Sequence, residues 1–208
     1  MDMGKNDEAF EILKGLKTQY GNQALYHSLL AQYYFQKGMK EEAFAEIDEY
    51  AKIEPNSPLI YQMRALIYEE AGDSFNEHIN WAKYNTLKGE KEVALNEYMT
   101  AYQFNNSDIE LTETIAIQLE SMKDTTKACE FYERLIELEP KNINALQKLA
   151  MFRDSIGDYR MAYEYIEKLK EIDPRNKFVL ENFESYKDKA ENGGSFLNFF
   201  KSIFCKRM

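Results

Sequence analysis

Apolar residues follow one another at the three-to-four-residue spacing of amphipathic helices along most of the chain. No convincing run of alternating apolar and polar residues indicates a β-strand, and turn-forming residues separate the helical stretches at short intervals. The pattern therefore predicts an all-α fold of about eleven helices. The expected helices span residues 5–19, 23–37, 40–53, 58–71, 74–87, 90–104, 108–122, 125–138, 142–156, 159–172 and 176–191.

The same residue types return along the chain at a fixed period. Pro140 and Pro174 are one period apart, and each follows an apolar, acidic helix end. The distance from Pro140 to Pro174 is long enough for two helices and their turns. It indicates a repeat of two helices, in which neighbouring copies stack to bury a shared core. Other residues at this spacing are Ala116 and Ala150, Ala128 and Ala162, Tyr132 and Ile166, Leu135 and Leu169, and, earlier in the chain, Gly21, Pro55 and Gly89.

One copy of the repeat reads LAQYYFQKGMKEEAFAEIDEYAKIEP, residues 30–55. It resembles the tetratricopeptide repeat, in which a helix with L-A-x-x-Y, a turn with glycine, a second helix with spaced Ala and aromatic residues, and a proline follow in order. Alanine permits close approach of two helices, and proline cannot continue a helix. The resemblance covers about residues 4–190 and implies a right-handed, TPR-type helical solenoid, with its best copies at 24–57 and 143–176.

The repeat changes register in the middle of the chain. The early set of periodic positions and the late set are offset from each other by half a repeat. The stretch DSFNEHINWAKYNTLKG can serve as the second helix of a pair with 58–71 or as the first helix of a pair with 90–104. We therefore expect a local kink or a three-helix unit near residues 74–104, which is either a drifted repeat without a role or a bend that shapes a binding groove.

Motifs of catalytic, nucleotide and metal sites are absent from the sequence. No P-loop, nucleophile-elbow or H-E-x-x-H pattern occurs, and His27 and His78 stand alone on their predicted helices. Cys129 and Cys205 have no metal-ligand spacing, and Cys129 is expected to pack as a small apolar residue. The net charge of −10 argues against a nucleic-acid partner. We expect no enzyme, no cofactor and no metal.

The resemblance implies a concave groove lined by the first helix of each pair, in which a partner segment binds. The groove is predicted to be neutral at one end and increasingly acidic past the middle, so the expected partner is a protein or peptide of basic or amphipathic character. The alternative is that these residues are only a solvated surface. The predicted lining residues are Ser28, Gln32, Phe35, Gln62, Leu66, Glu69, Glu113, Ile117, Glu120, Gln147, Met151 and Asp154.

The chain ends in SFLNFFKSIFCKRM, a segment with three cations and no acid. Because Asn192–Gly193–Gly194 is a typical helix stop, we expect a repeat domain at 1–191 and, at 192–208, a Gly-Gly hinge with a separate amphipathic helix. Three interpretations of this helix stay open: it caps the solenoid, lies in a membrane interface, or docks into a partner or another copy. Its predicted contact residues are Phe196, Leu197, Phe199, Phe200, Ile203, Phe204, Lys201 and Lys206.

Together these features predict a non-catalytic, cytoplasmic scaffold or adaptor that binds a protein segment in its groove. The alternative is a peripheral membrane adaptor, anchored by its amphipathic C-terminal helix.

Overall fold

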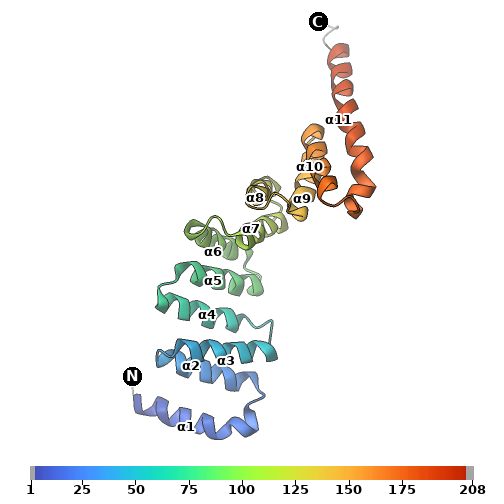
Figure 1. Cartoon of the computed structure of the whole chain (residues 1–208). Coiled ribbons are helices and arrows are strands. Elements are labelled where there is room, and N and C mark those ends of the chain that lie inside the picture. The colour runs from blue at the N-terminus through green and yellow to red at the C-terminus, as the bar shows by residue number, and fades with distance from the viewer. Residues whose placement is uncertain (1–2, 205–208) are drawn as a thin grey trace. The chain divides into compact units, whose positions relative to one another are not determined.

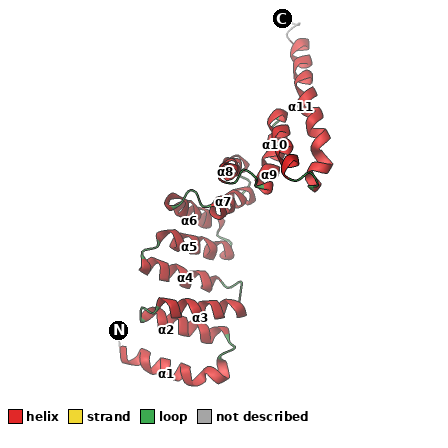
Figure 2. Cartoon of the chain, in the orientation of Figure 1, coloured by secondary structure: helices red, strands yellow, loops and turns green. Residues whose placement is uncertain are grey.

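The computed structural model describes residues 3–204, and side chains within residues 8–192. This part of the chain consists of eleven helices without a strand (Figure 2), as the sequence predicts. The chain divides into two compact units, residues 1–106 and residues 107–208. The first unit contains α1 (Met3–Tyr20), α2 (Ala24–Gln36), α3 (Lys40–Ile53), α4 (Pro58–Ala71), α5 (Ser74–Lys88) and α6 (Lys91–Phe104). The second contains α7 (Ile109–Ser121), α8 (Thr125–Leu138), α9 (Ile143–Ser155), α10 (Tyr159–Ile172) and α11 (Lys177–Phe204) (Figure 1).

A residue in the left-handed conformation follows five of the helices. Gly38, Gly72, Gly89, Lys123 and Gly157 have φ values from 65° to 80°, and they come after α2, α4, α5, α7 and α9. This conformation reverses the chain within a few residues, so that the next helix packs against the one just ended. These positions follow one another at the full repeat period, except that Gly72 and Gly89 are half a period apart. The half-repeat offset predicted from the sequence therefore falls on α5.

Helix α5 begins as the second helix of a pair and ends as the first helix of the next. Its N-cap, Asp73, has ψ 76°, close to the 65–75° found before α3, α6, α8 and α10, whereas the N-caps of α2, α4, α7 and α9 have ψ from 103° to 135°. At its other end, Gly89 has φ 79°. α5 packs extensively on both α4 and α6, so these helices form the expected three-helix unit.

The side chains of α5 agree with this double role. No residue from Asp73 to Asn85 is exposed, whereas α3 and α6 each leave one face in water. The hydrogen bond between His27 Nδ1 and Glu46 Oε2, at 2.6 Å between α2 and α3, has a counterpart between α5 and α6. There His78 Nδ1 lies 2.7 Å from Glu97 Oε2. The α5–α6 pair is therefore built like the α2–α3 pair.

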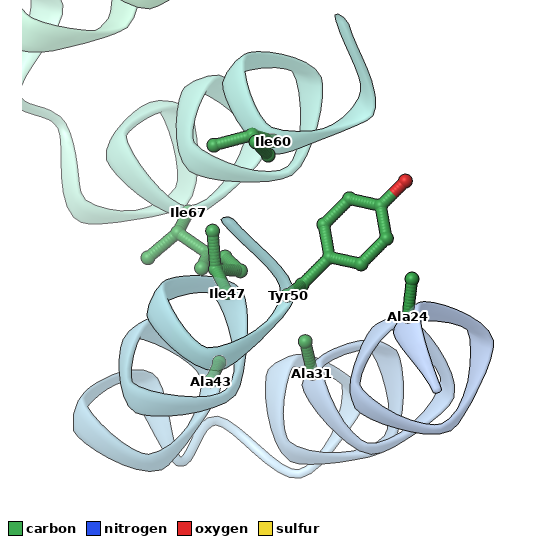
Figure 3. Packing of buried hydrophobic residues seen from close by; sticks show 7 residues of the cluster. All are labelled: Ala24, Ala31, Ala43, Ile47, Tyr50, Ile60 and Ile67. Carbon is green, nitrogen blue, oxygen red and sulfur yellow. The ribbon is translucent and has the colours of Figure 1, made fainter. Parts of the chain in front are cut away.

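The core of the first unit is a narrow layer between consecutive helices. Alanines of α2 and α3 (Ala31 and Ala43) let the two helices approach closely, and Ile47 of α3 meets Ile67 of α4 (Figure 3). Tyr50 crosses the same layer, and its hydroxyl reaches Ser57 Oγ at 2.7 Å in the turn before α4. This contact joins the C-terminal part of α3 to the turn before α4.

The second unit shows the same construction with stronger helix caps. The side chains of Asp108, Asp124, Asn142 and Asp158 accept a hydrogen bond from a backbone N–H in the first turn of α7, α8, α9 and α10. α9 packs on α10, and α11 packs on α10 in turn. In α11, Val179 and Tyr186 are buried, so the first half of α11 covers the last pair.

The predicted end of the last helix is wrong. The first ten helices agree with their predicted bounds to within two residues, but α11 continues through Gly193 and Gly194 to Phe204. Glycine lowers helix stability by about 1 kcal/mol relative to alanine and does not forbid the helix. The division into a repeat domain at 1–191 and a distinct C-terminal segment at 192–208 stays a prediction. Lys206 lies outside the described residues, and the side chains of the other predicted contact residues of this segment lie outside the described side chains.

A matched pair of variants tests the left-handed turns. Lys123, with φ 65°, is the non-glycine residue of this set. Lys123→Gly should raise the free energy of unfolding by about 0.5–1 kcal/mol, because a Cβ is disfavoured in this conformation. Gly157→Ala should lower it by about 1 kcal/mol, since the added Cβ meets no neighbour within 4 Å and only the backbone conformation is strained. Urea unfolding followed by circular dichroism measures both; equal signs for the two variants would contradict this account.

The three-helix unit predicts an unusual sensitivity in α5. Ala82 is fully buried in a helix that is covered on two sides. Ala82→Leu should cost about 1–3 kcal/mol by overpacking. Leu87→Ala, on the exposed end of the same helix at 43% exposure, should change the stability by less than about 0.5 kcal/mol. A thermal melt that tolerates Ala82→Leu as well as Leu87→Ala would argue against α5 being packed on both faces.

Candidate protein-binding groove

A groove lies between α2 and α4 in the first unit. Short connections make α3 antiparallel to both helices, so α2 and α4 run parallel. The hollow between them has a volume of about 330 Å³. We call it the α2–α4 groove. Its lining residues are Ser28, Ala31, Gln32, Phe35 and Gln36 from α2, and Leu59, Gln62, Met63, Leu66 and Ile67 from α4.

The lining of the α2–α4 groove contains no charged side chain. Charged residues make up 30% of the chain, so an uncharged surface of this size stands apart from its surroundings. Three glutamine amides supply hydrogen-bond donors and acceptors, and Leu59 and Leu66 leave more than a third of their surface in water. Solvent-exposed apolar surface with polar neighbours is typical of a binding site for another molecule.

The uncharged surface continues from α2 toward α1. A second hollow of about 170 Å³ lies between these helices, and Gln32 and Gln36 belong to both hollows. On the α1 side the ring of Phe10 stacks on Tyr33, with ring centroids 4.1 Å apart. Leu29 lines this second hollow, and Leu25 beside it is 66% exposed. The apolar strip along α2 therefore has hollows on either side.

Five predicted groove residues come together in the α2–α4 groove. They are Ser28, Gln32, Phe35, Gln62 and Leu66. The sixth residue predicted for this part of the face, Glu69, is exposed near the C-terminal end of α4 and does not line the hollow.

The predicted residues of the second unit have other surroundings. Glu120 Oε1 accepts a hydrogen bond from Lys148 Nζ at 2.6 Å, and Asp154 is paired with Lys189 Nζ at 2.6 Å. Glu113 accepts a hydrogen bond at 3.0 Å from an asparagine amide of α9. These carboxylates are held by neighbouring helices, so the second unit offers less free negative charge than its sequence indicates. That it binds a basic partner stays a prediction.

The remaining residues of this set do not form one continuous hollow. Met151 and Glu120 line a depression of about 200 Å³ together with residues of α8. Ile117 is 49% exposed and lies outside that depression, and Gln147 is half-buried on α9.

Glu120 is the carboxylate whose environment is best defined. Burial alone would raise the pKa of its carboxyl, but hydrogen bonds from Lys148 Nζ and from the Tyr132 hydroxyl, at 2.9 Å, hold the pKa below its usual value. The side chain keeps 40% of its surface in water, which screens the pair. The interaction joins α7, α8 and α9 and is therefore structural.

The sequence pattern missed half of the groove lining. Leu59, Met63 and Gln36 lie beside predicted residues on the same helix faces, but only one position per turn was projected from the repeat. The contribution of α1 was missed because no lining residue before Ser28 was projected from the repeat. Its Phe10, at helical spacing from Leu13, is the signal that could have shown it.

Two segments of the chain match a known repeat by sequence. Residues 115–142 and residues 143–176 each match the tetratricopeptide repeat. The chain is a tetratricopeptide repeat protein. No curated protein matches it by sequence. Repeats of this kind generally form non-catalytic scaffolds for protein–protein interaction, and their stacked helix pairs present extended binding surfaces.

Solved structures include several with a similar arrangement of helices. The C-terminal part of a TPR repeat-containing protein from Cytophaga hutchinsonii is 15% identical over 96% of this chain and 84% of its own, with a TM-score of 0.52. This likeness supports the helical repeat fold. Further matches are YrrB, described as a TPR protein with an unusual peptide-binding site, at 14% identity, 81% and 96% coverage and TM-score 0.45, and MamA, at 20% identity, 83% and 91% coverage and TM-score 0.43.

The cysteine and histidine side chains in the described part of this TPR protein have defined surroundings. Within it, no three His, Cys, Asp or Glu side chains gather in a way that would hold a metal ion. Burial raises the pKa of the Cys129 thiol to about 11, so the thiol is protonated at neutral pH and a poor nucleophile. His27 and His78 are each half-buried and paired with a glutamate.

The Glu120 interaction predicts a pH-dependent contribution to stability. A carboxyl with a lowered pKa in the folded state stabilises the fold above its unfolded pKa, near 4.3, and this contribution is lost as the pH falls through the folded value. Glu120→Gln should cost about 0.5–1 kcal/mol at pH 7, allowing for solvent screening. The difference from wild type should be smaller at pH 3 than at pH 7, because protonation of Glu120 removes the contribution. Urea unfolding at both pH values measures it, with Glu130→Gln on the exposed face of α8 as the control; a pH-independent difference would contradict the assignment.

Proposed function

We propose that this protein is a non-catalytic scaffold whose α2–α4 groove holds an apolar, largely uncharged segment of a partner protein. The observation that carries the proposal is the lining itself: ten residues without a charge, in a chain whose net charge is −10. A lining of this kind favours apolar side chains of a ligand and provides no electrostatic stabilisation for a strongly charged ligand.

The mechanism is the display of a preformed surface. α2 and α4 are held by the core behind them, so a bound segment is ordered while the protein itself changes little. Each apolar anchor that becomes buried contributes about 1.5–3 kcal/mol. Three such anchors contribute about 4.5–9 kcal/mol, of which the cost of association leaves at most about 5 kcal/mol, a Kd of about 0.2 mM or weaker. The three glutamine amides can hydrogen-bond the backbone or polar side chains of the segment and so set its register.

The sequence predicts a basic or amphipathic partner from the acidity of the face past its middle. An amphipathic segment is compatible with the uncharged lining of the α2–α4 groove. The cytoplasmic location and the alternative of a peripheral membrane adaptor anchored by residues 192–208 stay predictions. No helix in the described residues is both long enough and apolar enough to cross a bilayer.

Substitution of Leu66 tests the groove. Leu66→Glu places a charge among apolar groove residues at a position 36% exposed, so folding should be preserved while binding suffers. Peptides selected on the wild-type protein from a displayed library should be rich in apolar residues and should bind Leu66→Glu at least about tenfold more weakly. Titrations by fluorescence anisotropy provide the measurement.

The matched control is Ile117→Glu. It introduces the same charge at an exposed isoleucine of α7, outside the groove. This variant should bind the selected peptides as the wild type does. Equal binding by wild type and Leu66→Glu would show that the ligand site lies elsewhere.

A further inference from the structure

The C-terminal segment of this chain has the chemistry that the α2–α4 groove fits. Residues 195–204 contain six large apolar residues and a single charge, Lys201. Two more cations, Lys206 and Arg207, follow directly, and the segment has no acid. An apolar helix of about ten residues is about 15 Å long, which is shorter than the thirteen-residue α2 beside the groove. The segment is therefore no longer than α2.

The C-terminal part of helix α11 continues the helix past α10. Because α11 is one helix from Lys177 to Phe204, the segment cannot turn back over α9 and α10. Figure 1 shows the C-terminal part of α11 extending beyond α10. In sequence, Phe183, Ala190, Leu197 and Phe204 follow one another at seven-residue steps, so the apolar stripe of α11 continues past the part that packs on α10.

The groove has an electrically negative end. α2 and α4 are parallel, so their C-terminal ends lie on the same side, and helix C-termini carry partial negative charge. Glu69 and Glu70 add two exposed carboxylates at the end of α4. Lys37 follows α2 at this end, and its ammonium lies 5.6 Å from the ring centroid of Tyr33. The two cations that follow the last turn of the segment are therefore favoured at this end.

We propose, on the basis of the function proposed above, that residues 195–208 of one copy dock into the α2–α4 groove of a second copy. The helix lies parallel to α2 and α4, with its apolar residues against Phe35, Leu59 and Leu66 and with Lys206 and Arg207 near Glu69 and Glu70. The contact joins unlike surfaces, so it closes into a dimer when it is reciprocal and continues head to tail when it is not.

Two full-length variants test the contact by complementation. Leu66→Glu damages the groove and keeps the tail, whereas Phe200→Glu with Phe204→Glu damages the tail and keeps the groove. Sedimentation velocity should give a mass that rises with concentration above 24.5 kDa for the wild type and stays at 24.5 kDa for each variant alone. A 1:1 mixture of the two variants should again form a dimer, since one supplies the tail and the other the groove. Ile117→Glu should assemble as the wild type does.

A labelled peptide supplies an independent measurement. Residues 195–208 with Cys205→Ser and a fluorophore should bind the tail-damaged variant, and Leu66→Glu should reduce the affinity at least about tenfold. Glu69→Lys with Glu70→Lys should weaken binding several-fold at low salt, and a peptide with Lys206→Glu and Arg207→Glu should restore it. Failure of the reversed charges to restore binding would overturn the proposed orientation.

The proposal is overturned if the wild type stays at 24.5 kDa at all concentrations, or if Leu66→Glu assembles normally. A wild type that stays monomeric and sediments with phosphatidylglycerol-containing vesicles through the same phenylalanines would identify a membrane anchor instead. If library peptides bind the groove but residues 195–208 do not, the proposed function survives without this occupant. If neither binds, both proposals are wrong.

Discussion

Each helix pair between α2 and α10 depends on one residue in the left-handed conformation, placed directly after the first helix of the pair. This conformation turns the chain back at once and leaves little choice in how the second helix packs. The alanines of the first unit then set the distance between the two helices, because a larger side chain at Ala31 or Ala43 would hold them apart. The groove depends on the same geometry, since α2 and α4 are parallel only because α3 returns between them.

Most of the fold could be predicted from the sequence, because the residues that determine each helix and turn are close together in the sequence and recur in each repeat. Turn residues, caps and apolar spacing act within a few positions, and the repeat period confirms each signal several times. The offset at α5 was also visible, but whether that helix served α4 or α6 was not, since both uses need the same apolar residues. The end of α11 was mispredicted because Gly193 and Gly194 are compatible with a helix stop and with a helix interior.

The candidate site was predictable only in part, for a geometric reason in the first unit and an electrostatic reason in the second. Groove residues such as Gln32 and Leu66 could be projected from the repeat because they face away from the core of their own pair. The net charge on the surface of the second unit could not be predicted from the repeat. Lys189 pairs with Asp154, and two helix connections separate these residues in the sequence. A count of carboxylates along one face therefore overstates the field that a ligand meets there.

The sharing of α5 has a consequence for how the first unit folds. In a regular repeat array each pair has its own stability and is coupled to its neighbours through an interface. Here neither α4 nor α6 can form a pair without α5, so the block from Pro58 to Phe104 contains no internal boundary at which it can open by a whole repeat. Local unfolding can begin at α1 or α2. It does not spread gradually into α4, α5 and α6, because these three helices unfold together as one cooperative unit.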